Sequence, residues 1–118
     1  MTSTQALKVG RAYKILYDDV WHYIIINGQK MELSPTQYRI FRSFCSQQSA
    51  SGAMLAGMEI ISYVPRSQLR HATELTELSL RKHISKLNSR LRGYHLQIQP
   101  LHDGYMLLLM GDDTQHRA

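Results

Sequence analysis

The stretch S-L-R-K-H-I-S-K-L-N-S-R-L-R-G, residues 79–93, decides the fold that this sequence predicts. Read as a helix, it carries an apolar stripe on one side at helical spacing. The residues of this stripe are Leu80, Ile84, Leu87 and Leu91. The rest of the stretch is polar, with five lysines and arginines and no carboxylate. Such a helix can bury its stripe and offer its basic face to the major groove of DNA, which admits one α-helix. An ordinary core helix with a solvated basic face fits this stretch alone equally well.

The charge of the chain is concentrated around the same stretch. The 118 residues have a net charge of +5. Residues 66–92 contain seven lysines and arginines and two glutamates, an excess equal to that of the whole chain. A basic field confined to one region is typical of a nucleic-acid-binding protein.

Composition and motifs argue against several other classes. With 43% apolar and 19% charged residues, the chain reads as one globular domain. Cys45 is the single cysteine, so neither an internal disulfide nor a cysteine-based metal site is expected. The sequence has no signal-peptide pattern and no apolar run near the roughly 18 residues of a membrane span, which favours a cytoplasmic protein without membrane association. It lacks H-E-x-x-H, G-x-S-x-G and phosphate-loop motifs, so we expect no enzyme, metal or cofactor.

The N-terminal third predicts a small antiparallel sheet after a loose tail of residues 1–11. Three segments rich in β-forming residues follow one another, at residues 13–17, 20–26 and 29–33. Asn27-Gly28, between the last two, is the strongest short hairpin signal because both turn residues need positive φ.

A helix is expected directly after this sheet. Ser34 can cap it, Pro35 suits its first position, and Gln37 can complete a capping box. The helix should run to about residue 47. Its apolar residues at helical spacing are Tyr38, Phe41, Phe44 and Cys45.

The C-terminal half predicts two further helices and a hairpin. Residues 48–57 are expected to form a loop and residues 58–64 a short strand. A short helix over residues 66–72, with Leu69 facing inward, precedes the basic helix, which Thr76 or Ser79 can cap and Gly93 can end. The hairpin arms are residues 96–99 and 105–110, Asp103-Gly104 supplies the turn, and residues 111–118 are a polar tail.

This order of elements resembles the effector domain of the OmpR/PhoB class of bacterial response regulators, over about residues 12–110. Residues 33–41, L-S-P-T-Q-Y-R-I-F, are similar to that family's L-T-x-x-E-[FY]-x-[IL]-L at the start of its first helix. Residues 83–91, H-I-S-K-L-N-S-R-L, are similar to [HV]-I-x-x-L-R-x-K-[IL] in its recognition helix. Residues 103–105, D-G-Y, are similar to G-x-G-Y in its wing.

The resemblance implies an α+β fold, a winged helix-turn-helix with an N-terminal antiparallel β-sheet, a three-helix core and a C-terminal β-hairpin wing. It implies a transcription regulator of a two-component system that binds double-stranded DNA, with residues 77–92 in the major groove and the wing, residues 96–110, at the adjacent minor groove. Residues 73–77 stand where the family often meets RNA polymerase, and the family often binds DNA as a homodimer.

The expected DNA contacts come from the basic region and the wing tip. Lys86, with His83 and Ser79, is expected to contact bases, while the arginines and Lys82 neutralise phosphates. The full set is Arg66, Arg70, Ser79, Lys82, His83, Lys86, Arg90, Arg92 and His102.

Several departures from the family pattern leave an alternative open. Leu101, followed by His102, stands where the wing usually carries an arginine, and Asn88 stands where another basic residue is common. Residues 48–64 are longer than the usual connection between the first two helices. No receiver domain precedes the sheet, so we expect a stand-alone regulator or part of a longer protein. The alternative function is a regulatory adaptor that binds proteins through residues 54–61 and the apolar wing, with little or no DNA binding.

Overall fold

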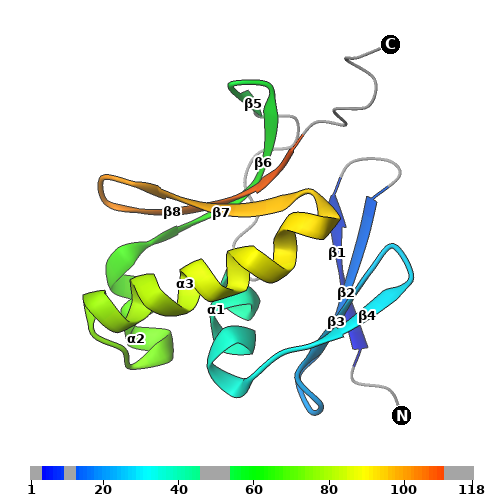
Figure 1. The fold of residues 1–118 in the computed structure, drawn as a ribbon, viewed down its shortest axis with the longest axis horizontal. Coiled ribbons are helices and arrows are strands. Elements are labelled where there is room, and N and C mark those ends of the chain that lie inside the picture. The colour runs from blue at the N-terminus through cyan, green and yellow to red at the C-terminus, as the bar shows by residue number, and fades with distance from the viewer. Residues whose placement is uncertain (1–3, 10–12, 46–53, 111–118) are drawn as a thin grey trace.

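The computed structural model describes residues 4–9, 13–45 and 54–110 of the chain. Within these ranges the fold is α+β, with two four-stranded antiparallel sheets and three α-helices. The elements in chain order are β1 (Thr4–Val9), β2 (Tyr13–Asp18), β3 (Tyr23–Ile26), β4 (Gln29–Glu32), α1 (Pro35–Cys45), β5 (Met54–Leu55), β6 (Met58–Pro65), α2 (Arg66–Thr73), α3 (Glu77–Leu91), the 3-10 helix η1 (Arg92–Tyr94), β7 (Leu96–Leu101) and β8 (Gly104–Leu109). In Figure 1 the three α-helices lie together, with α3 beneath the β7–β8 hairpin and the first sheet to one side.

The first sheet has the strand order β1-β2-β3-β4. Its β3–β4 turn confirms the predicted hairpin, because Asn27 and Gly28 have φ of 49° and 88° and Ile26 pairs with Gln29. Two consecutive residues with positive φ match the right-handed twist of the flanking strands.

The predicted N-terminal tail is wrong for residues 4–9. They form β1, which pairs antiparallel with β2 from Thr4↔Asp18 to Val9↔Tyr13. This segment is a strand because β2 lies beside it and pairs with it, and not because of a strong pattern in its own sequence. The other residues of the predicted tail, 1–3 and 10–11, lie outside the described ranges.

The predicted strand over residues 20–26 begins three residues later, at Tyr23. The Asp18 carboxylate accepts hydrogen bonds from the backbone N–H groups of Val20 and Trp21, both at 2.9 Å, and His22 has φ of 59°. This turn ends the strand geometry and leaves the Trp21 side chain 74% exposed.

The helices pack around one core, as their patterns predicted. The Ser34 hydroxyl caps α1 by accepting from the Gln37 N–H at 3.2 Å. Leu69 of α2 is fully buried, and the apolar stripes of α1 and α3 are buried as well. The α1 and α3 stripe residues in this core are Tyr38, Phe41, Phe44, Cys45, Leu80, Ile84, Leu87 and Leu91. The last two residues of the predicted first helix, 46 and 47, lie outside the described ranges.

The second sheet has the order β5-β6-β8-β7, which makes the C-terminal hairpin part of a larger sheet. The strand predicted over residues 58–64 is confirmed as β6. The loop predicted over residues 48–57 is wrong for residues 54–57, which form β5 and a tight turn with positive φ at Ala56 (51°) and Gly57 (82°). Residues 48–53 lie outside the described ranges.

Both glycines predicted to end or turn the C-terminal elements have other roles. Gly93 lies inside η1, and His95, with φ of 63°, takes the left-handed conformation after it. The hairpin turn consists of His102 and Asp103, because Leu101 pairs with Gly104. A side chain on Gly104 would lie 2.5 Å from the Tyr63 hydroxyl and 2.6 Å from the Val64 carbonyl oxygen, so close strand packing requires this glycine.

Candidate nucleic-acid interface

The outer face of α3 is basic. Glu77, its first residue, is the only carboxylate of the helix. The buried stripe occupies the opposite side, and every lysine and arginine of the helix is exposed. The exposed cations of α3 and of the first η1 residue are Arg81, Lys82, Lys86, Arg90 and Arg92.

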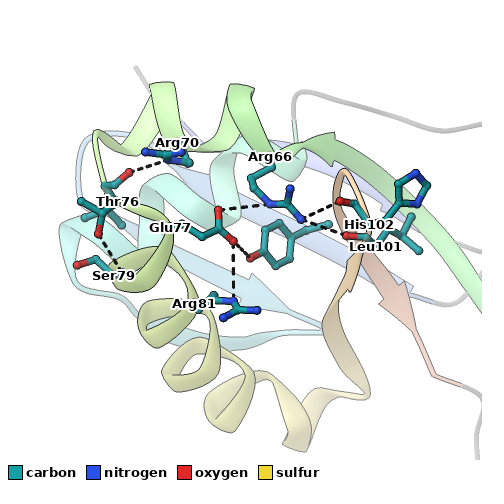
Figure 2. Close-up of polar contacts among 10 residues, drawn as sticks. Arg66, Arg70, Thr76, Glu77, Ser79, Arg81, Leu101 and His102 are labelled. Atoms are coloured by element: carbon teal, nitrogen blue, oxygen red, sulfur yellow. Dashed lines mark hydrogen bonds and ion pairs between the residues drawn. The ribbon is translucent and has the colours of Figure 1, made fainter.

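A side-chain cap fixes the start of α3. Of the two predicted capping residues, Thr76 makes the cap, and its Oγ1 accepts from the Ser79 N–H at 3.2 Å. Just before it, Arg70 Nε donates to the Leu75 carbonyl at 3.3 Å. Figure 2 marks this hydrogen bond of Arg70 with a dashed line. Arg70 therefore braces the α2–α3 turn while its side chain remains exposed.

Arg66 joins α2 to the hairpin tip and to α3. Its Nη2 donates to the carbonyl oxygens of His102 at 3.0 Å and Leu101 at 3.4 Å, and its Nε lies 3.3 Å from Glu77 Oε1 (Figure 2). The sequence predicts this arginine as a phosphate contact. In the structure its guanidinium group is engaged by the protein on two sides, which leaves fewer of its donors for an external anion.

Glu77 also contacts Arg81 and Tyr105. Its Oε2 lies 3.8 Å from Arg81 Nε and accepts from the Tyr105 hydroxyl at 3.5 Å (Figure 2). Burial, and then the nearby Glu77 charge, raise the pKa of Tyr105, so this hydroxyl stays protonated and donates. Two guanidinium groups therefore balance the only negative charge of α3.

The hairpin tip is tied to β6 and α2. The Tyr63 hydroxyl donates to Asp103 Oδ1 at 2.6 Å, and the Arg66 N–H donates to the Asp103 carbonyl at 3.0 Å. The hydrogen bond from Tyr63 lowers the pKa of the Asp103 carboxyl and raises that of Tyr63 itself. The tip has no lysine or arginine, and His102 is its exposed histidine.

Asn88 connects α3 to the hairpin further along. Its Nδ2 donates to the Ile98 carbonyl at 2.9 Å, and its Oδ1 accepts from the Ile98 N–H at 2.8 Å. Ile98 lies on β7, one of the two edge strands of the second sheet. Asn88, which stands where the resembled family often has a basic residue, thus has a structural role. Its amide can satisfy both backbone groups of Ile98, and a lysine cannot.

A groove of about 580 Å³ lies between α3 and the β7–β8 hairpin. Three arginines line it, Arg66, Arg81 and Arg92, against the single carboxylate of Glu77. The hydroxyls of Ser85 and Ser89 lie along the α3 side. Net positive charge and many donors suit an extended anionic partner.

The predicted contact residues fall in three places. The part of α3 outside the groove carries Lys82, Lys86 and Arg90, which are exposed, and Ser79 and His83, which are half-buried. The groove contains Arg66 and Arg92. The exposed α2–α3 turn region and the hairpin tip contain Arg70 and His102.

Sequence reasoning did not select Arg81, Ser85 and Ser89, which also line the groove. Helical spacing alone puts these residues on one edge of α3, next to Arg92. What the sequence could not supply was the side of α3 on which the hairpin lies.

The described residues offer few other sites. They contain no group of three or more His, Cys, Asp or Glu residues placed to hold a metal ion. Among them, no helix combines the length and the apolar character needed to cross a membrane.

Comparison with known proteins adds no family assignment. No protein-family model, no curated protein and no solved structure matches the chain.

Proposed function

We propose that this chain is a winged-helix DNA-binding transcription regulator. The observation that carries the proposal is the division of α3 into a buried apolar stripe and an exposed face whose formal charges, Glu77 apart, are all positive. An α-helix of this kind fits the major groove, where phosphate neutralisation supplies affinity and side chains at base edges supply sequence preference.

The groove suggests the path of one DNA strand. A helix in the major groove and a hairpin at the neighbouring minor groove must straddle the sugar-phosphate backbone between them. That backbone would run past Arg81 and Arg92, with the serine hydroxyls of α3 as further donors. Lys82 and Lys86, outside the groove, would then lie deeper in the major groove.

The two kinds of contact predict different defects. Lys86→Ala should relax sequence preference, because a lost base contact affects one sequence more than another. Arg92→Ala should weaken binding to all sequences alike, because phosphates are the same everywhere.

The wider setting of the proposal follows the resemblance. In a bacterial two-component system the protein would act in the cytoplasm as a dimer on DNA. The exposed Glu74 in the α2–α3 turn would face RNA polymerase. Loss of transcriptional activation by Glu74→Ala with unchanged DNA affinity would test this contact.

The decisive experiment is a titration of labelled random duplex DNA at about 50 and 200 mM salt. The test variant is Lys82→Glu/Lys86→Glu. The matched control is Lys30→Glu/Arg39→Glu, which changes the net charge equally at exposed residues outside α3. Circular dichroism establishes that each variant is folded.

Five neutralised phosphates would give a log–log salt slope of about −4.5, and so an affinity loss on the order of 10² to 10³ between the two salt concentrations. We expect the α3 variant to lose binding and the control to retain most of it. Equal losses in both variants would mean that net charge alone drives binding. No wild-type binding at the lower salt concentration would reject the proposal.

A second candidate function is protein binding without DNA. It is favoured by the hairpin tip, which lacks lysine and arginine, and by β5, where the Leu55 side chain is exposed. Retention of a partner by wild type but not by Leu55→Asp, in the absence of any duplex binding, would support it.

A further inference from the structure

Leu78, the second residue of α3, is a large apolar side chain held in solvent. Its side chain is 63% exposed. The other large exposed apolar residues of the described ranges lie outside α3: Val20 and Trp21 in a turn, Leu55 on β5 and Leu101 on β7. Leu78 is therefore a separate apolar point on an otherwise polar and basic helix face.

Its position on the helix is not an extension of the buried stripe. At 100° per residue, Leu78 lies about 150° from the middle of that stripe. It shares the outermost line of α3 with Lys82, Ser85 and Ser89, at intervals of four, three and four residues. Ser85 and Ser89 also line the groove beside the hairpin, whereas Leu78 and Lys82 lie outside it. On the proposed function, Leu78 and Lys82 therefore face the major groove.

Leucine can recognise only an apolar group there. The base edges in the major groove are hydrogen-bond donors and acceptors, except for the C5-methyl group of thymine. Residues in the first turn of a recognition helix are those that usually reach base edges. Leu78 lies in the first turn, and Thr76 caps that turn in a fixed geometry.

We infer that Leu78 packs against a thymine methyl group and gives the protein a preference for thymine at one position of its binding site. The inference rests on the proposed function and goes beyond it, because it names the chemical group that is read. Removing one methyl group from such a contact should weaken binding about fourfold, the equivalent of one buried CH₂.

The test begins with a binding site selected from a random duplex library by the wild-type protein. Each thymine of that site is then replaced, one at a time, by deoxyuridine, which lacks only the methyl group. Dissociation constants are measured for wild type, Leu78→Ala and the control Val20→Ala. Val20 is equally exposed at 63% but lies in a turn of the first sheet.

We expect one deoxyuridine position to weaken wild type and the control about fourfold and to leave Leu78→Ala unchanged. The inference is overturned if Leu78→Ala loses affinity at that position as wild type does, or if no position responds. If either of these outcomes occurs and wild type still binds the unmodified duplex, the inference fails but the proposed function stands. Absence of wild-type binding to every duplex overturns both.

Discussion

Asn88→Ala should destabilise the fold measurably although residue 88 is only partly buried. The substitution removes two hydrogen bonds of good length, 2.9 and 2.8 Å, and leaves the Ile98 N–H and carbonyl without these partners. Each such bond contributes about 1 kcal/mol net, and an orphaned, partly buried backbone group costs about 1–3 kcal/mol. We therefore expect a loss of about 2–4 kcal/mol, a large part of the roughly 5–15 kcal/mol of a domain this size.

The assay is urea denaturation followed by far-ultraviolet circular dichroism, with thermal melting as a second measure. For a chain of this length the expected loss corresponds to a fall in Tm on the order of 10 °C. Asn88→Asp should be similarly unstable, because a carboxylate can accept from the Ile98 N–H but cannot donate to the carbonyl.

Ser89→Ala is the matched control. It is the next residue of α3, is exposed, and its hydroxyl donates only within the helix, to the Ser85 carbonyl at 3.3 Å. Its free energy of unfolding should change by no more than about 0.5 kcal/mol. If Asn88→Ala lowers the free energy of unfolding by no more than Ser89→Ala does, the reasoning is refuted. Water would then replace the amide as a partner of the Ile98 backbone without cost.

Two further substitutions test the packing. Gly104→Ala should lower the free energy of unfolding by about 1–3 kcal/mol, because the new methyl group overpacks against Tyr63 and the β6 backbone. Gly93→Ala should be neutral or stabilising, because a Cβ at this position would meet open space. Equal changes in the Tm of the two variants would contradict this. Burial raises the pKa of the Cys45 thiol to about 12, so a thiol reagent should label the native protein slowly at neutral pH. Because the folded-state pKa lies above the unfolded value of 9.0, the free energy of unfolding should fall as pH rises from about 9 to 12, and less so in Cys45→Ala; an equal fall in both proteins would refute the assignment.

Features that depend on two or three neighbouring residues were predictable from the sequence. The Asn27-Gly28 turn and the Ser34 cap each involve groups at most three positions apart. The cap of α3 also acts over three positions, and the sequence narrowed it to Thr76 or Ser79, of which Thr76 makes it. The buried stripes of α1 and α3 were also predictable, because helical period alone selects their residues.

Features that depend on distant segments were not. β1 is a strand because β2 lies beside it, and the three-residue shift at the start of β3 follows from the reach of the Asp18 carboxylate. Neither leaves a strong pattern in the local sequence.

The candidate interface shows the same division. A count of lysines and arginines locates the basic region, but it treats all cations as equivalent. Arg66 differs from the others because Glu77, eleven positions away, and the carbonyl of His102, thirty-six positions away, both contact its guanidinium group. Asn88 similarly pairs with a strand ten positions further on, which no helical pattern reveals.

The ties between α3 and the hairpin have a thermodynamic consequence. Arg66 and Glu77 connect the two walls of the groove near the hairpin tip, and Asn88 connects them further along. A groove held in this way has little conformational entropy left to lose when a partner fills it. The adjustment must then come from the partner. For a DNA duplex, sequences that bend or narrow easily to match the preformed groove would bind more tightly than stiff ones, even at base pairs that no side chain touches.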